Sequence, residues 1–140
     1  MGAKMSLCED LTKALIEFRD ESGEEKLNKV LEIIDQMYKN NEIIPVPGYY
    51  WGNDKGFTFE EIRTMDGKSI LLSMLSEPKF FKEKSNNNQL LGMNIRMFFA
   101  NYFSVDRFDG IIINSDSDIM LPLPNNYLVK LKLFEDFKNN

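Results

Sequence analysis

The sequence predicts an α+β fold, and three observations carry this prediction. Ile111, Ile112 and Ile113 stand between Asp-Gly and Asn-Ser-Asp, a pattern typical of a short strand buried on both faces. Apolar residues recur at helical spacing through most of the first 40 positions. Asp66-Gly67 separates two apolar runs, which indicates a β-hairpin. We therefore expect an N-terminal helical hairpin, a mixed or antiparallel β-sheet with a hairpin at Asp66-Gly67, a central strand at 111–113, and helices packed on the sheet.

The composition bounds the class of protein. A chain of 140 residues suits one domain, so residues 1–140 are expected to fold together. The hydrophobic fraction of 43% is large enough for a core and argues against disorder. The formal net charge is −5, and no cluster of basic residues stands out. Nucleic acid and anionic membrane surfaces are therefore disfavoured as partners.

The acidity lies in the first half of the chain. Residues 1–66 hold 14 acidic against 8 basic residues, whereas residues 67–140 hold 8 against 9. A field of this sign would attract a basic partner. The alternative is a solvated helical surface that keeps the protein in solution.

The single cysteine, Cys8, excludes an internal disulfide and a multi-cysteine zinc site. Without a secretory signal or a long apolar run, the expected compartment is the cytoplasm. Residues 1–6 fit the loose myristoylation pattern, but we interpret residues 1–5 as a short leader or cloning remnant before a start at Met5.

Two capping boxes predict the N-terminal helices. Ser6 with Glu9, and Ser22 with Glu25, have the spacing in which a hydroxyl and a carboxylate satisfy free amides at a helix start. The short break between the helices favours an antiparallel hairpin, which Asn40-Asn41 would end. The expected apolar faces are Leu7, Leu11, Leu15 and Phe18 in the first helix, and Leu27, Val30, Leu31, Ile34 and Met37 or Tyr38 in the second.

The next segment is expected to be mostly extended. Residues 43–47 contain two prolines, which cannot donate to a ladder, so this piece should lie at a sheet edge or leave the sheet. Residues 48–56 are interpreted as a loop. Residues 57–64 and 68–75 are the two arms of the hairpin, although the capping-box spacing of Thr58 and Glu61 leaves a non-strand start open.

The second half alternates helices with short strands. Ser76 and Pro78 predict the start of a short helix, residues 85–89 a surface loop, and residues 95–104 a third main helix. Residues 119–121 can pair with the isoleucine strand across a turn at 114–118. A last helix should follow, using Tyr127, Leu128, Leu131 and Phe134, although residues 129, 131 and 133 also alternate at strand period.

Several of these motifs together resemble the SseB-type N-terminal domain family, named for enhanced serine sensitivity. The likeness spans roughly residues 7 to 133, in matching order, and where the family has a Phe-Thr-Ser stretch this chain has Met74-Leu75-Ser76. The resemblance implies a compact bacterial α+β domain with no established activity or cofactor, and it supplies no catalytic residues. It is carried by Ile43-Ile44-Pro45-Val46-Pro47, Asp66-Gly67-Lys68-Ser69-Ile70-Leu71, Ser76 and Asp109-Gly110-Ile111-Ile112-Ile113-Asn114.

Residue types argue against catalysis and cofactors. The sequence has no histidine, which removes the commonest general base and the usual transition-metal ligand. Cys8, beside apolar helical residues, is interpreted as core filler. Asn114, Asp116 and Asp118 begin like a calcium loop but lack its glycine and final glutamate, so we interpret them as a turn. Glu60 and Glu61, expected on opposite strand faces, could not share one substrate bond. We expect no enzyme activity and no cofactor.

The best candidate for partner binding is Tyr49, Tyr50 and Trp51, two tyrosines and the only tryptophan between two glycines. Aromatic side chains anchor interfaces because they bury much area at little entropic cost. The alternative is that these rings fold back over the core.

The leading hypothesis is a cytoplasmic, non-enzymatic protein-binding domain whose partner could be basic. An immunity role against a basic toxin would be one version of it. One alternative is a pocket for a small, amino-acid-like molecule between the sheet and the helix 95–103. Another is a structural component that self-associates through the strand at residues 43–46.

Overall fold

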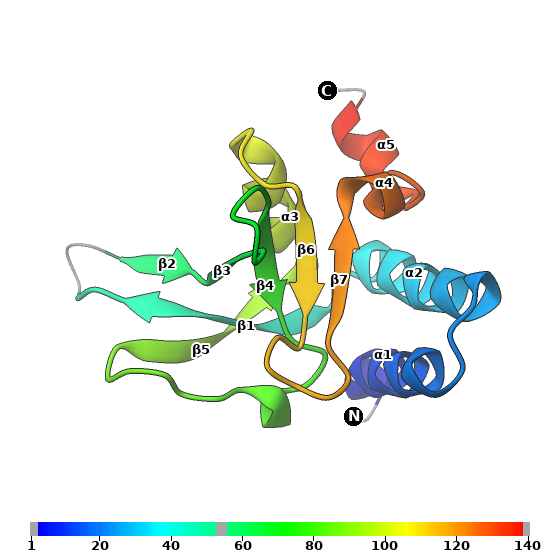
Figure 1. The fold of residues 1–140 in the computed structure, drawn as a ribbon, viewed down its shortest axis with the longest axis horizontal. Coiled ribbons are helices and arrows are strands. Elements are labelled where there is room, and N and C mark those ends of the chain that lie inside the picture. Colours follow the sequence, from blue (N-terminus) through cyan, green and yellow to red (C-terminus); the bar gives the residue numbers. More distant parts are fainter. Residues whose placement is uncertain (1–2, 53–55, 139–140) are drawn as a thin grey trace.

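The computed structural model describes residues 3–52 and 56–138, and its helices and strands confirm the expected α+β class (Figure 1). The helices are α1 (Ala3–Asp20), α2 (Glu24–Lys39), α3 (Ile95–Ser104), α4 (Asn125–Leu128) and α5 (Leu133–Lys138), with a 3₁₀ helix η1 (Pro78–Phe80). The strands are β1 (Ile43–Tyr50), β2 (Phe57–Phe59), β3 (Glu61–Arg63), β4 (Ile70–Met74), β5 (Asn88–Asn94), β6 (Gly110–Ile113) and β7 (Leu121–Pro124).

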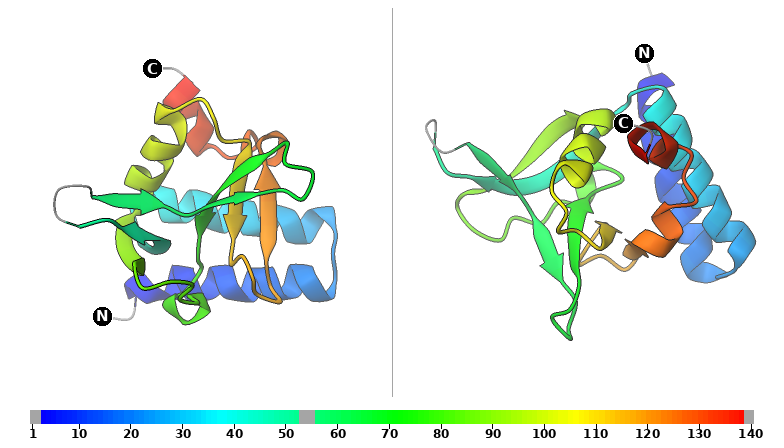
Figure 2. Two further views of the ribbon diagram at one scale, coloured as in Figure 1. Left: turned by 60° about the vertical axis from the view of Figure 1, so that its left-hand side comes forward. Right: turned by 90° about the horizontal axis from the view of Figure 1, so that it is seen from above.

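The predicted N-terminal helical hairpin is present, with α1 and α2 lying side by side (Figures 1 and 2). Both predicted capping boxes are wrong. Helix α1 begins at Ala3, so Ser6 lies inside it. Ser22 Oγ donates to the carbonyl of Phe18 at the end of α1, and Gly23 occupies the N-cap of α2. A serine hydroxyl that bonds backward in this way is no longer available to the following helix.

The expected leader at residues 1–5 stays a prediction. Met1 and Gly2 lie outside the described residues, whereas residues 3–5 form the first turn of α1.

The prediction that residues 43–47 form a sheet edge is wrong, because β1 is the middle strand of a three-stranded sheet in the order β2-β1-β5. The backbone direction explains how this strand holds two prolines. Ile95 N–H donates to Glu42 O, and Tyr50 N–H to Asn87 O, so the even-numbered residues of β1 face β5. Hydrogen-bonded pairs alternate with non-bonded pairs along an antiparallel ladder. The backbone N and C=O groups of Pro45 and Pro47 therefore point away from β5.

The two proline carbonyls connect β1 to the second sheet. Pro45 O accepts from Leu75 N–H at 3.0 Å, and Pro47 O accepts from Glu60 N–H at 3.1 Å. Neither bond requires a donor from β1. The missing N–H groups of the prolines therefore cost no bond on either side of the strand.

The second sheet has four strands in the order β3-β4-β6-β7, and β6 confirms the predicted central strand. All four residues of β6 are buried, and the strand runs parallel to β4 and antiparallel to β7. The hairpin at Asp66-Gly67 is confirmed, with Gly67 at φ 72°. Its first arm, however, divides at Glu60: β2 joins β1, and β3 joins β4.

The second half departs from the sequence prediction in three further places. Residues 85–87 of the expected loop precede β5, but Asn88 and Gln89 are the first two residues of this strand. The strand expected at 119–121 is β7, two residues later; as an edge strand it tolerates Pro122 and Pro124. The single last helix is two short ones, α4 and α5. The predicted helix at 95–104 is confirmed as α3.

One face of the four-stranded sheet packs against the helical pair, and this contact forms the core (Figure 2). Alternate residues of β4, β6 and β7 point to this face, as the period of a strand requires. The sheet contributes Leu72, Met74, Ile111, Ile113, Leu121 and Leu123; the helices contribute Leu11, Leu15, Val30, Ile34 and Met37.

A buried polar network ties the end of β6 to the rest of this core. Asn114, fully buried at φ 57°, accepts from Ser76 N–H at 2.9 Å through Oδ1 and donates to Ser76 Oγ at 3.0 Å. Ser76 Oγ in turn bonds Thr12 Oγ1 at 2.8 Å. Ser76, predicted as a helix cap, is thus a buried partner of Asn114, and Glu77 takes the cap position of η1. Asn114 begins a turn, with Ser117 N–H bonded to its carbonyl.

Replacing Asn114 with alanine should destabilise the protein by about 2–4 kcal/mol, because it removes two buried hydrogen bonds and leaves Ser76 N–H without an acceptor. Asn41→Ala is the matched control: it has the same left-handed backbone (φ 51°), is less buried, and loses only one long, exposed hydrogen bond, from Arg96 N–H at 3.4 Å. Chemical denaturation of both variants gives the difference. Equal losses would show that the backbone conformation, and not the network, carries the stability.

Candidate functional site

The three-stranded sheet projects from the body of the molecule, and its far end points away from α1 and α2 (Figure 1). Tyr49 and Tyr50 are the last residues of β1, so the prediction that they lie in a loop is wrong; Trp51 follows directly. Tyr50 is 36% exposed and Trp51 50% exposed. The alternative that these rings cap the core therefore does not hold for Trp51.

The far end of this sheet carries aromatic side chains on both faces. Register places Tyr50 with Phe57, and Gly48 with Phe59, on one face; Tyr49 lies with Thr58 on the other. A Cβ at Gly48 would come within 2.4 Å of the Phe57 ring, so glycine is what allows this ring to lie across β1. We name this end of the sheet the aromatic tip: Tyr49, Tyr50, Trp51, Phe57 and Phe59.

Trp51 is held in place although half of it is exposed. Its Nε1–H donates to Thr58 Oγ1 at 2.8 Å, and its ring lies 6.2 Å from that of Tyr49. An ordered, exposed aromatic ring loses little freedom when a partner covers it, which favours binding. The sequence prediction missed Phe57 and Phe59, which were interpreted only as strand residues.

A groove of about 590 Å³ lies on the same sheet, nearer the helices. Its floor is the face of β1 and β5 that carries Ile43, Pro45, Leu90 and Gly92, and Pro78 of η1 contributes to its wall. Ile43 is 60% exposed. This groove is not in the expected place between the sheet and α3, where Phe98 and Phe99 are fully buried in the core.

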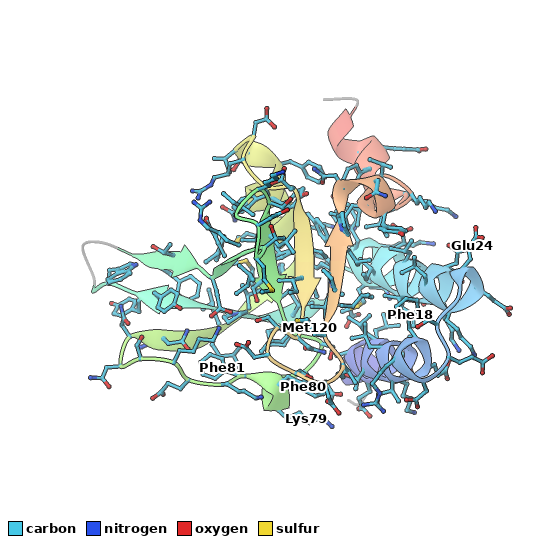
Figure 3. All side chains as sticks on the ribbon, viewed as in Figure 1. Phe18, Glu24, Lys79, Phe80, Phe81 and Met120 are labelled. Atoms are coloured by element: carbon cyan, nitrogen blue, oxygen red, sulfur yellow. The ribbon has the colours of Figure 1, made fainter. Side chains whose placement is uncertain are left out.

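The segment that follows η1 separates the groove from the aromatic tip. Phe81 and Lys84 of this segment, with Phe80 at the end of η1, lie against Pro47, in the middle of the same sheet face. Figure 3 shows Phe80 and Phe81 near the body of the protein, with Lys79 at its margin. The sheet therefore offers two distinct surfaces.

Carboxylates lie near Cys8, at the helical end of the groove. Glu42 lines it and is 9% exposed. Cys8 also lines it and, as interpreted from the sequence, is a buried core residue, 3% exposed. Burial, followed by the charges of Glu42, Glu77 and Glu9, raises the pKa of the Cys8 thiol to about 11. The thiol is therefore protonated near neutral pH and is a poor nucleophile. We call Glu9, Glu42 and Glu77 the acidic rim.

Glu60 and Glu61 do not form a catalytic pair. Buried Glu60 lies between β2 and β3, with Lys84 Nζ 3.2 Å from Oε1, and Glu61 contacts Arg107 at 2.7 Å. Burial lowers the pKa of Lys84, but the hydrogen bond with Asp116 and the charge of Glu60 outweigh it, so the net shift is upward. A lysine that holds its proton in this way is not an activated nucleophile.

Comparison of the chain with protein-family models, curated proteins and solved structures found no match. Within residues 3–52 and 56–138, no three His, Cys, Asp or Glu side chains are grouped closely enough to hold a metal ion. None of the helices in the described part of the chain has the length and apolar character needed to cross a membrane.

Trp51 should report the state of the aromatic tip directly, since it is the only tryptophan. Because half of its surface is exposed, its emission should lie close to that of tryptophan in water, and acrylamide should quench it readily. Unfolding should then change the emission maximum little. A strongly blue-shifted, poorly quenched emission from the folded protein would contradict an exposed tip.

Proposed function

We propose that this chain is a non-enzymatic protein-binding domain whose aromatic tip contacts the partner. The observation that carries the proposal is the exposure of Trp51 on a projecting sheet, with its indole ordered by Thr58. Tryptophan and tyrosine dominate binding energy at protein interfaces, since they bury large areas and carry a polar end. Exposed rings of this size have no role in the core.

Charge supports a basic partner. The chain carries a net charge of −5, and the excess of acidic residues lies within the first 66 positions. Complementary charge speeds encounter between partners and weakens with salt. The same proposal places the domain in the bacterial cytoplasm, on the basis of the single cysteine and the resemblance to the SseB-type N-terminal domain family.

Small-molecule binding is the second candidate function, and the groove at Ile43 and Gly92 favours it. A volume near 590 Å³ falls within the range of small-molecule sites, which runs from about 300 to 1,000 Å³. An apolar floor with one buried carboxylate, Glu42, would suit an apolar molecule with an amino group, such as an amino acid.

The protein-binding function is tested by retention of proteins from native lysate on the immobilised chain, at roughly 50 and 500 mM salt. The wild type should retain a specific protein more strongly at low salt. The double variant Tyr50→Ser with Trp51→Ser should lose most of it, because the two substitutions remove the exposed rings.

The matched control is Met65→Ser with Met120→Ser, which removes two exposed apolar side chains elsewhere on the surface. This control should retain the partner as the wild type does. Equal retention by the tip variant, or no retained protein at either salt, would contradict the proposal.

A further inference from the structure

We propose that the outer edge of β5 binds an extended peptide of a protein partner as an additional strand. The peptide would place an apolar side chain in the groove beside Gly92 and a lysine or arginine near the acidic rim. This inference goes beyond the proposed function, because it concerns a surface separate from the aromatic tip. Its success or failure can therefore be measured independently of Trp51.

The backbone of β5 has groups available for a further strand. Hydrogen bonds at Glu42–Ile95 and Tyr50–Asn87 fix which residues of β5 face β1. By alternation, Leu91 and Met93 face β1, whereas Leu90 and Gly92 turn their N–H and C=O outward. Among the described residues, no backbone hydrogen bond reaches these outward groups. Such an edge is a template for strand addition.

The groove lies where the side chains of an added strand would point. The peptide residues that pair with Leu90 and Gly92 would have their side chains on the sheet face that also carries Ile43 and Pro45. Gly92 is exposed and has no side chain, and Ile43 Cγ2 is the nearest atom to a Cβ built on it, at 3.4 Å. An apolar side chain of the peptide would cover Ile43, which is 60% exposed, and would contact Pro78 across the groove.

The acidic rim determines the charge of the peptide. Glu42 is the only charged side chain among the described residues that line the groove, and no described basic side chain pairs with it. Glu77 is only loosely paired, with Lys79 Nζ at 4.0 Å. The β5 edge of a second copy, Asn88–Asn94, contains no lysine or arginine that could pair with this rim. Charge complementarity therefore favours a basic peptide over self-association.

The spacing of the peptide residues follows from strand geometry. Side chains on one face of a strand are two residues apart, or roughly 7 Å. The ladder between β1 and β5 ends at the pair Ile43–Asn94, and Glu42 is the next residue along the chain beyond this end, bonded through its carbonyl to Ile95 N–H. A lysine two residues from the apolar side chain lies on the same face and can extend its flexible stem toward this end.

The probe is the blocked peptide acetyl-Thr-Lys-Thr-Leu-Thr-Lys-Thr-amide, in which leucine and both lysines share one face in either strand direction. Binding is followed by amide NMR of the isotope-labelled protein, which should show shifts at Leu90 and Gly92. The peptide with glutamate in place of lysine should bind at least about tenfold more weakly. Of two versions N-methylated at the leucine or at the adjacent threonine, one should lose binding and the other keep it, because only one of these N–H groups faces β5.

Two substitutions at Gly92 test the edge and the groove separately. Gly92→Pro removes an outward N–H and leaves the hydrogen bonds between β5 and β1 intact, just as Pro45 and Pro47 leave these bonds intact from the β1 side. This variant should bind the peptide about tenfold more weakly. Gly92→Val fills the groove and should weaken binding similarly. Gln89→Val is the matched control: it is exposed on the opposite face, and it should bind as the wild type does. Thermal unfolding confirms that each variant is folded.

Several results would overturn the inference. Strand addition would be excluded if both N-methylated peptides bound like the parent peptide. It would also be excluded if the Gly92→Pro variant bound the peptide as the wild type does. Equal binding of the glutamate peptide would exclude the role of the acidic rim. Leucine amide alone producing the same shifts would identify a small-molecule site instead. A wild-type dimer that Gly92→Pro converts to a monomer would identify a second copy as the occupant. Loss of peptide binding in the Tyr50→Ser, Trp51→Ser variant would show that the peptide binds at the aromatic tip instead of at this edge.

Discussion

The placement of two prolines in β1 is the constraint on which the arrangement of both sheets depends. The backbone N and C=O groups of Pro45 and Pro47 point away from β5, so the ladder with β5 is complete. At these two residues the opposite edge of β1 offers only acceptors. A regular strand on that edge would need donors at both positions. Instead, single N–H groups of Glu60 and Leu75 reach the two carbonyls, and the strands to which they lead turn into a second sheet. The three-stranded sheet is consequently free to project from the body, with its outer edge and its aromatic tip accessible.

Those parts of the fold that depend on local pattern could be predicted from the sequence. Helical spacing, the Asp66-Gly67 turn and the run of isoleucines in β6 are each determined within a few residues, and the structure contains all of them. The division into two sheets could not be predicted, because it depends on which side of β1 meets which neighbour. The rule that proline avoids central strands does not take into account which way the backbone N and C=O groups point, and this direction decides whether a strand residue needs an N–H at all. A strand such as β5, which begins with polar residues and is interrupted by Gly92, carries too weak a pattern to be identified from the sequence alone.

The candidate site was found in part. Tyr49, Tyr50 and Trp51 stood out by composition, and the structure places them at the end of a projecting strand instead of in a loop. Phe57 joins them only through the register of β2 with β1, which sequence spacing does not reveal. The groove and the acidic rim were not predicted, since they bring together residues from α1, β1, η1 and β5. The absence of histidine, in contrast, is visible in the sequence alone.

The accessible outer edge depends on the alternation of backbone N–H direction along β5, and native-state hydrogen exchange of the β5 amides tests this alternation most directly. The amides of Leu91 and Met93, which face β1, should be strongly protected, whereas those of Leu90 and Gly92 should exchange rapidly. Uniform protection along β5 would show that its outer edge is already paired. Rapid exchange at Leu91 and Met93 would show that the ladder to the proline-bearing strand does not form as described.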